Sequence, residues 1–254
     1  MTKRVFLGIA ILGLLIGTVN VYTQGPAQGP GQGTGRSGRG GGKGPGGMRP
    51  GGDAGASDTS FFASDIQAKD EAEQKIFDVL KDMDKSRQGM MSVPMEDGRF
   101  LRILAESMGA QRVIEIGTSQ GFSAIWFCVG LRKTGGKLTT FEIDEGRAKI
   151  AQENFKRAGV DGIVTLVLGD AHEKVKDLKG EIDILFLDAD KDGYVDYLNK
   201  LLPLVRPGGL VIAHNINRQQ ADPKYLEAIT KNPQLESLLV SLQAGGIGVS
   251  LKKR

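Results

Sequence analysis

Between residues 110 and 215, short apolar runs alternate with amphipathic stretches, and this alternation constrains the fold more than any other feature of the chain. The clearest helix is predicted at 144–159. The apolar runs are short enough to be buried strands, and they lie at 112–117, 137–143, 163–169, 183–188 and 209–214. Strands and helices in alternation form βαβ units, and hence a parallel sheet with helices on both faces.

Two further strand-like runs, 235–242 and 247–253, lie on either side of Gly245 and Gly246. A Gly-Gly pair between such runs is typical of an antiparallel hairpin. We therefore predict an α/β fold with a doubly wound, mostly parallel sheet of seven strands that ends in an antiparallel hairpin. Two helices are expected ahead of the sheet, and Gly109 is expected to end the second one.

The first 60 residues have a different composition from the rest. An apolar run from Val5 to Val21 follows Lys3 and Arg4, which predicts a signal peptide or a membrane anchor over residues 1–24. Residues 25–60 are rich in Gly and Pro and almost free of large apolar side chains, so they predict a flexible tether. The folded domain is then 61–254. We expect the N-terminal segment to engage a membrane or the secretion machinery, so that the protein is either anchored or exported. The sequence leaves open on which side of the membrane the folded domain lies.

The charge of the chain argues against a nucleic-acid partner. The formal net charge is only +3, and several basic residues lie in the tether rather than in the folded part. Cys128 is the only cysteine, so no internal disulfide can form.

The turn after the first predicted strand indicates a nucleoside cofactor. Glu115, Gly117 and Gly121 lie at the carboxyl end of that strand, where open parallel sheets bind ligands and glycine permits close approach of the backbone. The next strand ends in Glu142, about 20 residues further on, where a carboxylate can accept ribose hydroxyls. A tight turn beside an ordinary exposed Glu is the structural alternative, and the pairing of the two features favours the cofactor.

The spacing of the glycines bears on which cofactor this is. A dinucleotide site has G-x-G-x-x-G, which lets a helix N-terminus meet a pyrophosphate, whereas this turn has E-x-G-x-x-x-G. An NAD-dependent oxidoreductase is therefore disfavoured. Together with Asp170 after the third strand, the pattern resembles the S-adenosylmethionine site of class I methyltransferases.

Five segments extend this resemblance. Their order is that of the catechol and caffeoyl-CoA O-methyltransferase family, and the similarity runs from about Met90 to the C-terminus. The segments are SVPMEDGRFLRIL, VIEIGTSQGFSA, FEIDEGRAKIAQENFKRAG, ILFLDADKDGYVDYL and LLPLVRPGGLVIAHN. The resemblance implies a Rossmann-like methyltransferase fold with S-adenosylmethionine as the methyl donor.

The same resemblance implies the residues of the cofactor site. Glu142 would hold the ribose, Asp170 and Ala171 the adenine, and Asp190 would lie near the sulfonium. Met91 and Val93 would close over the cofactor. The methionine part would be lined by Glu115, Gly117, Ser119 and Ser123, and the set is completed by Gly121, Ile143 and Asp188.

The DADKDGY segment carries the predicted chemistry. A phenolic hydroxyl with a pKa near 10 is mostly protonated at neutral pH, so a cation that polarises it and an amine that takes its proton both favour methyl transfer. In the family that this chain resembles, the acid at Asp188 holds a divalent cation and the lysine at Lys191 lies beside the acceptor hydroxyl. We predict Asp188 as a metal ligand and Lys191 as the base, and Asp192 as the N-cap of the helix that follows.

His214 and Asn215 depart from the family, which usually has Asp-Asn at this place as two further metal ligands. An imidazole removes one negative charge and offers nitrogen, which favours Mn²⁺, Fe²⁺ or Zn²⁺ over Mg²⁺. Three alternatives stay open for His214: it ligates such a metal beside Asn215, it acts as a general base in a metal-free site, or it has no chemical role. His172, the only other histidine, is expected on a surface helix.

The sequence thus predicts an enzyme, an S-adenosylmethionine-dependent O-methyltransferase that acts on a hydroxyl of a small, aromatic, catechol-like acceptor. Two alternatives remain: a tethered, non-catalytic nucleoside-binding module on the same fold, and an NAD-dependent oxidoreductase. The resemblance also implies a homodimer, although no sequence feature marks its interface.

Overall fold

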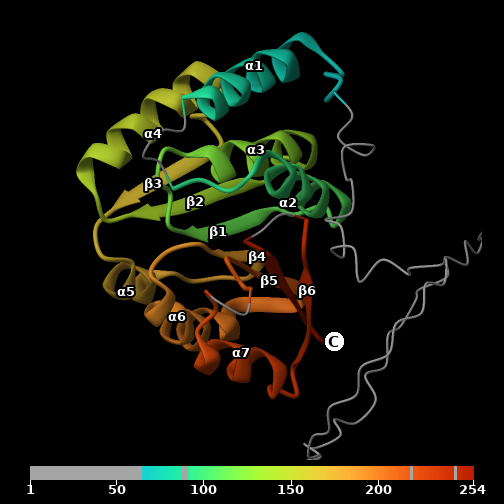
Figure 1. Ribbon diagram of the computed structural model, residues 1–254, viewed down its shortest axis with the longest axis vertical. Coiled ribbons are helices and arrows are strands. Elements are labelled where there is room, and N and C mark those ends of the chain that lie inside the picture. The colour runs from blue at the N-terminus through green and yellow to red at the C-terminus, as the bar shows by residue number, and fades with distance from the viewer. Residues whose placement is uncertain (1–64, 87–90, 218–219, 243–244) are drawn as a thin grey trace, which may run out of the picture. The chain divides into compact units, whose positions relative to one another are not determined.

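Seven strands form one sheet in the computed structural model, in the order β3-β2-β1-β4-β5-β7-β6 (Figure 1). The first five strands are parallel, and β7 is antiparallel to both β5 and β6. The strands are β1 (Arg112–Ile116), β2 (Lys137–Glu142), β3 (Val164–Leu168), β4 (Ile182–Leu187), β5 (Val205–His214), β6 (Leu235–Val240) and β7 (Ile247–Lys252). The predicted sheet, with its C-terminal hairpin, is confirmed.

The structure describes residues 65–86, 91–217, 220–242 and 245–254. The predicted leader (1–24) and tether (25–60), and residues 61–64 of the predicted domain, lie outside these ranges. None of the helices in the described ranges combines the length and the hydropathy that crossing a membrane requires.

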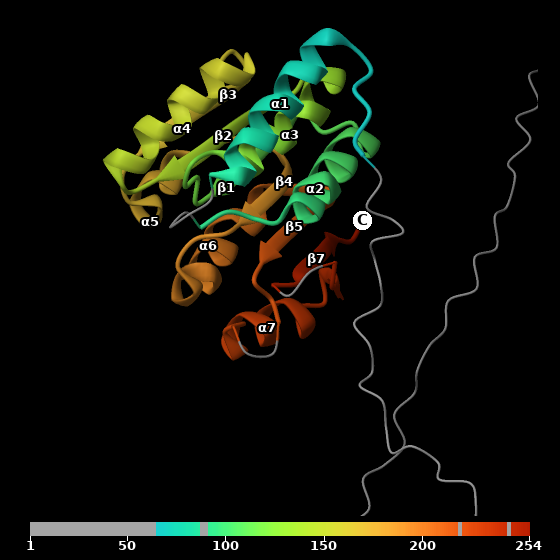
Figure 2. The same cartoon turned by 45° about the horizontal axis from the view of Figure 1, so that its top comes forward.

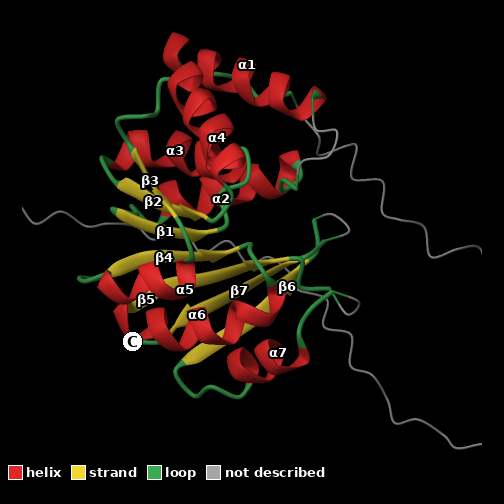
Figure 3. Ribbon diagram, turned by 90° about the vertical axis from the view of Figure 1, so that its left-hand side faces the viewer, coloured by secondary structure: helices red, strands yellow, loops and turns green. Residues whose placement is uncertain are grey.

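Helices cover both faces of the sheet (Figure 3). One face carries α1 (Glu71–Lys85), α2 (Met95–Ser107), α3 (Phe122–Thr134) and α4 (Glu145–Ala158), and α1 packs across α3 and α4 (Figure 2). The other face carries α5 (Ala171–Lys174), α6 (Tyr194–Leu201) and α7 (Pro223–Thr230), with short 3-10 turns at Val175–Asp177, Lys191–Gly193 and Leu202–Leu204.

The pleat of the strands divides the apolar side chains between two cores. Ile184 and Phe186 of β4 point into the core under α1 to α4, whereas Leu185 and Leu187 point into the core under α6 and α7. Strands buried on both faces are continuous apolar runs, which is why they are recognisable in the sequence.

The predicted helix at 144–159 is confirmed, and the residues that bound it explain its limits. Asp144 accepts a hydrogen bond from the backbone N–H of Arg147 at the start, and Gly159 adopts φ 69° at the end. Gly109, with φ 64°, likewise follows the end of α2 as predicted.

Most predicted strand ends agree with the structure within two residues, and two features differ more. The strand predicted from residue 209 begins at Val205, because Val205 pairs with Ile182 and the register then shifts through the Pro-Gly-Gly segment before Leu210 pairs with Ile184. The prediction that Asp192 is a helix N-cap is wrong. The chain already turns as a 3-10 helix from Lys191 to Gly193, so Asp192 lies inside that turn and α6 begins at Tyr194.

Candidate active site

The strand order reverses between β1 and β4, and open α/β sheets bind ligands at such a switch point, outside the carboxyl ends of the strands. The backbone joins the two strands there, since the N–H of Asp188 donates to the carbonyl oxygen of Ile116 at 2.9 Å. The predicted site residues from Glu115 to Asn215 lie at or just beyond the carboxyl ends of β1 to β5 or in the first turn of the helix that follows. The structure therefore brings them to one rim of the sheet.

The turn between β1 and α3 needs its glycines. Gly117 has φ 97° and Gly121 has φ 88°, and a Cβ at Gly117 would overlap the backbone carbonyl of Asp188. Ser119 also has a positive φ, of 48°, and its buried hydroxyl has no hydrogen-bond partner. A non-glycine residue in this conformation and an unpaired buried hydroxyl are both uncommon, and they mark the turn as a place shaped for a ligand.

Glu142 at the end of β2 is held by two backbone donors. The N–H of Ser119 donates to Oε2 at 2.7 Å and the N–H of Asp144 donates to Oε1 at 3.0 Å. A carboxylate has about four acceptor positions, so two are still open for ribose hydroxyls. The predicted role of Glu142 stays a prediction, and its orientation is compatible with that role.

Glu115 is fully buried beneath the turn, and hydroxyls occupy both of its carboxyl oxygens. Ser123 Oγ donates to Oε1 and Thr140 Oγ1 donates to Oε2, each at 2.6 Å. Burial raises the pKa of Glu115 to about 8 against the opposing effect of these two hydrogen bonds. Ser123 thus supports Glu115 directly, and Thr140 is a partner that the sequence analysis missed.

Apolar side chains flank this rim. Met91 and Ile143 are 68% and 71% exposed, which is unusual for residues of their size. Val93 and Ala171 are buried, and Asp170 caps α5 by accepting the N–H of His172 at 2.8 Å. Exposed apolar side chains beside a hydrogen-bonding turn fit the planar base and the aliphatic part of a nucleoside cofactor.

His214 lies between two carboxylates at the end of β5. Its Nε2 is 3.0 Å from Oδ2 of Asp97, and its Nδ1 is 3.4 Å from Oδ1 of Asp188. The contact between Nε2 and Asp97 is a hydrogen bond. The contact between Nδ1 and Asp188 has the distance of an ion pair but not the alignment of a hydrogen bond, so Nδ1 is a buried nitrogen without a hydrogen-bond partner. Asp97 comes from α2, far from His214 in the sequence.

Electrostatics couple these three residues. Burial alone would lower the pKa of His214, but Asp188 and Asp97 raise it to about 9. Burial would raise the pKa of Asp188, but His214 and Lys191 hold it below its usual range. A metal ion at this place would have to displace a proton from His214.

Lys191 lies on the other side of Asp188. Its Nζ is 3.4 Å from Asp188 Oδ1 and donates to the hydroxyl of Tyr194 at 2.7 Å. The Tyr194 hydroxyl donates in turn to the carbonyl oxygen of Leu187 at 2.9 Å, which fixes it at the end of β4. Lys191 is thus held at the rim, close to the predicted metal ligand.

Asp190 belongs to a neighbouring cluster. The hydroxyl of Tyr197 donates to its Oδ1 at 2.9 Å, and Nε2 of His172 lies 3.4 Å from its Oδ2. His172 was expected to be a surface residue; it is about one third exposed, but its Nδ1 pairs with Asp196 and its ring stacks on Tyr197 at 4.2 Å.

Asn215 follows His214 directly and has a left-handed backbone, with φ 58°. Its role as a metal ligand stays a prediction.

Asp97 is the main residue that the sequence analysis missed. Acidic residues in the first turn of a helix are common and are usually explained by the helix dipole, so Asp97 gives only a weak signal in the sequence. One signal was available: Asp97, Leu101 and Leu104 follow helical spacing, so the apolar stripe of α2 continues into a carboxylate. A fully buried carboxylate at the end of such a stripe needs a partner of its own.

The donors near Asp188 bear on the predicted metal site. Within the described ranges, no three His, Cys, Asp or Glu side chains are grouped so that they could hold a metal ion. Asp188 and His214 supply only two such donors, and the 3.4 Å between Asp188 Oδ1 and His214 Nδ1 is an ion-pair distance, so the described residues do not form a complete metal site.

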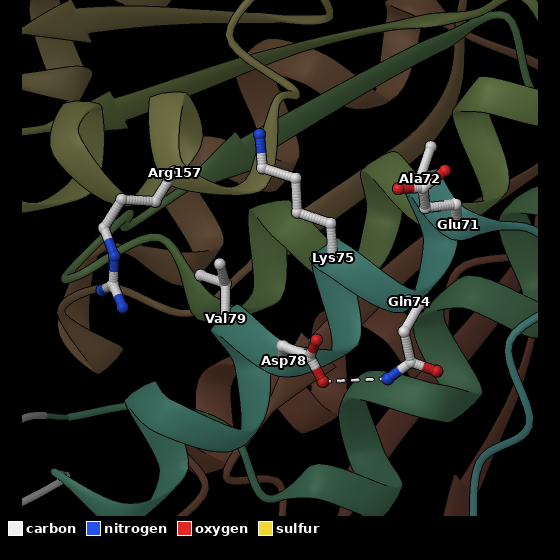
Figure 4. A pocket seen from close by; sticks show the side chains of 7 residues that line it. All are labelled: Glu71, Ala72, Gln74, Lys75, Asp78, Val79 and Arg157. Carbon is white, nitrogen blue, oxygen red and sulfur yellow. Dashed lines mark hydrogen bonds between the residues drawn. The ribbon is translucent and has the colours of Figure 1, made fainter.

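A separate surface groove of about 780 Å³ lies between α1 and α4 (Figure 4). Lys75 of α1 and Arg157 of α4 both line it, and Gln74 donates to Asp78 across one turn of α1 at 2.8 Å. None of the predicted site residues lines it. The groove therefore does not contribute to the rim described above.

Comparison with known proteins agrees with this geometry. A sequence profile of the O-methyltransferase family matches residues 67–235. The catechol O-methyltransferase of Niastella koreensis is 37% identical over 150 residues, which are 58% of this chain and 66% of the relative. That of Mycobacterium tuberculosis is 37% identical over 129 residues, 50% of this chain and 58% of the relative.

A solved structure is also similar. The O-methyltransferase of Bacillus cereus in complex with SAH superposes with a TM-score of 0.65 at 26% identity, and the match covers 77% of this chain and 95% of that one. The similarity to solved structures thus extends over most of the described domain.

Proposed function

Because the chain belongs to the O-methyltransferase family, we propose that it transfers a methyl group from S-adenosylmethionine to a hydroxyl of a small, aromatic, catechol-like acceptor. The matched stretches span about two thirds and somewhat more than half of the first two curated relatives, so the reaction and the acceptor are our proposals. The observation that carries them is the rim itself. It places a glycine turn, a ribose-type carboxylate and an Asp-Lys pair around one switch point.

Named residues would hold the cofactor. Glu142 would accept the ribose hydroxyls, Ser119 would offer its unpaired hydroxyl, and Met91 and Ile143 would cover the adenosine with apolar surface. When bound, S-adenosylmethionine supplies an electrophilic methyl group on a sulfonium. The carboxylates of Glu142, Asp188 and Asp190 surround the place with negative charge that suits this cation.

The acceptor hydroxyl would lose its proton to Lys191. The Nζ of Lys191 is anchored by Tyr194 and Asp188, so an acceptor at the rim would meet an amine whose position is fixed. Asp188 keeps a compensating negative charge beside the ammonium that results. A general base at a fixed position contributes about 10²–10⁴-fold to the rate.

We also propose a divalent metal, of the Mn²⁺, Fe²⁺ or Zn²⁺ type, held by Asp188 and His214 with Asn215 nearby. The resemblance of the 188–215 segments to the family supports this, whereas Asp188 and His214 are only two donors and do not complete a site by themselves. Such an ion would polarise the acceptor hydroxyl. A nitrogen ligand in place of a carboxylate favours these ions over Mg²⁺.

Calorimetric titration with S-adenosylmethionine and SAH tests the cofactor assignment. We expect binding by the wild type, at least tenfold weaker binding by Glu142→Gln, and unchanged binding by Glu153→Gln, whose side chain is exposed on α4. An amide cannot accept hydrogen bonds at both ends, so one backbone donor in Glu142→Gln would be left unpaired. Failure of the wild type to bind would overturn the proposed function. Binding without turnover of any phenolic acceptor would support the alternative of a non-catalytic nucleoside-binding module.

Two further proposals concern the whole protein. The sequence of residues 1–24 supports membrane insertion or export, which a compartment-sensitive reporter fused to the C-terminus would test.

Two exposed leucines on the edge strand β6, Leu238 and Leu239, support self-association. Light scattering on the wild type and on Leu239→Lys would test the homodimer, and a monomeric wild type would refute it.

A further inference from the structure

We infer that His172 and Tyr197 are positioning residues of the cofactor site: they hold the carboxylate of Asp190 and thereby fix its distance from the sulfonium of the methyl donor. This inference rests on the proposed function, because Asp190 meets a sulfonium only if S-adenosylmethionine binds at the rim. It adds two residues that lie outside the strand ends. It also predicts that the site distinguishes the charged donor from the neutral product SAH.

Both carboxyl oxygens of Asp190 have a partner. The hydroxyl of Tyr197 donates to Oδ1 at 2.9 Å, and Nε2 of His172 lies 3.4 Å from Oδ2. Burial and the Asp190 carboxylate raise the pKa of Tyr197, so its hydroxyl stays protonated and remains a donor. Each carboxyl oxygen has two lone pairs, so Asp190 can be held in this way and still face a cation.

The imidazole ring of His172 is itself fixed by α6. Its Nδ1 lies 2.5 Å from Oδ2 of Asp196, and it stacks on Tyr197 with ring centroids 4.2 Å apart and planes 17° from parallel. Lys200 donates to the backbone carbonyl of His172 at 3.0 Å and also pairs with Asp196. The ring is therefore anchored by three side chains of one helix before it meets Asp190.

The strand order shows why such a link is needed. Strands β3 and β4 are not neighbours, because β2 and β1 lie between them, so no ladder of backbone hydrogen bonds joins their ends. His172 spans this distance. Its N–H donates to Asp170, which follows β3, at 2.8 Å, and its ring contacts Asp190, which follows β4. Asp170 is predicted at the adenine and Asp190 at the sulfonium, so His172 links the two ends of the cofactor site.

The turn after Asp190 closes on the same group. A Cβ at Gly193 would overlap the Asp190 carboxylate and both rings, so only glycine lets the turn approach this closely. The N–H of Gly193 donates to the backbone carbonyl of Asp190 at 3.1 Å. The carboxylate thus lies between the turn and the two rings, although 54% of the Asp190 side chain is exposed. Exposure leaves it accessible to a ligand, and the packing restricts its rotamers.

Charge gives this arrangement its consequence. The sulfur of S-adenosylmethionine is positive, whereas the thioether sulfur of SAH is neutral. A carboxylate at a fixed short distance therefore stabilises the donor and not the product, and the effect falls as the distance grows. Glu142 differs in this respect, because its predicted partner is the ribose that both molecules share.

The test compares the two ligands on the full chain. Calorimetry gives the dissociation constants of S-adenosylmethionine and of SAH for the wild type, Tyr197→Phe and His172→Asn. We expect the ratio of the first constant to the second to rise about three- to tenfold in both variants, since each loses one contact to Asp190. A loss that is merely structural would weaken both ligands alike and leave the ratio unchanged.

Tyr225→Phe is the matched control, because Tyr225 is an equally buried tyrosine of the same core and lies on α7. We expect its ratio to equal that of the wild type. Tyr197→Phe keeps the ring that stacks on His172, so this variant decides the test if His172→Asn does not fold.

A double-mutant cycle shows whether Tyr197 acts through Asp190. We expect Asp190→Asn to raise the ratio at least as much as Tyr197→Phe does. In the double variant, Tyr197→Phe should then add nothing to the effect of Asp190→Asn. Independent, additive effects of the two substitutions would overturn the inference.

The remaining outcomes separate the inference from the proposed function. A wild type that binds both ligands, with an unchanged ratio in Tyr197→Phe or in Asp190→Asn, would overturn the inference and leave the methyltransferase proposal standing. An equal rise of the ratio in Tyr225→Phe would overturn it as well. Failure of the wild type to bind either ligand would instead count against the proposed function.

Discussion

Lys191 is the residue on which the proposed proton transfer depends. Its amine lies between the Tyr194 hydroxyl and the Asp188 carboxylate, and a methionine of similar length would keep the packing and remove the base. We expect Lys191→Met to lower kcat by about 10²–10⁴-fold with a phenolic acceptor. The affinity for SAH, measured by calorimetry, should not change.

Lys176→Met is the control for this prediction, because Lys176 is half exposed and pairs with Glu173, and it contacts neither Asp188 nor Tyr194 in the hydrogen bonds and ion pairs of the described residues. An equal loss of activity in both variants would point to a general effect of removing a positive charge. Equal activity of Lys191→Met and the wild type would exclude Lys191 as the base.

His172 makes stability depend on pH. The pKa of His172 is raised above 6.5, chiefly by its hydrogen bond to Asp196 and further by Asp190, against a smaller opposing effect of burial. Tyr197 stacks on the ring, and Lys200 donates to the backbone carbonyl of His172 at 3.0 Å. A histidine whose pKa is raised by folding stabilises the folded state fully below its unfolded pKa, and this contribution is lost as the pH rises through the folded pKa.

We therefore expect His172→Gln to be less stable than the wild type below pH 6.5, with a difference that shrinks at alkaline pH. Urea unfolding at several pH values measures it. Asp196→Asn should remove most of the same pH dependence. A difference between wild type and His172→Gln that is constant with pH would show that the ring acts by packing alone.

At the scale of single elements, α2 links the helical layer to the active site. Gly98 lies against the ring of Trp126, which is 1% exposed and cannot move into solvent. We expect Gly98→Ala to destabilise the fold by about 1–3 kcal/mol through overpacking, although alanine is the better helix former by about 1 kcal/mol. Urea unfolding measures the free energy.

Gly162→Ala is the matched control, because nothing lies within 4 Å of the position of its Cβ. That variant should be as stable as the wild type or slightly more stable. A fully stable Gly98→Ala would mean that α2 can shift outward from α3, and the contact between Asp97 and His214 should then lengthen.

The elements were predictable where one local signal determined them. Each buried strand is a continuous apolar run, and α4 has both an Asp cap and a terminal Gly, so their positions follow from the sequence. The start of β5 was not predictable, because Val205 joins the sheet across a register shift that no local pattern specifies. The pairing of Asp97 with His214 was not predictable either, because it depends on how α2 docks on α3.

At the scale of the whole molecule, the rim joins residues that are widely separated in the chain. Asp97 lies on α2, Glu142 and His214 end β2 and β5, and Asp188 directly follows β4. The residue types could be recognised from their places at strand ends. Their mutual distances, and hence the position of His214 between Asp97 and Asp188, required the assembled sheet.

The predicted domain boundary at residue 61 is a claim about the whole molecule. The family match covers 67–235, and residues 25–60 are almost free of large apolar side chains that could join a core. We therefore expect a chain that begins at residue 61 to unfold at the same temperature as the full chain and to bind SAH with the same affinity. Calorimetry measures both quantities. A truncated chain that binds SAH more than tenfold more weakly would show that residues 1–60 contribute to the cofactor site, and the leader and tether would then have to be regarded as part of the enzyme.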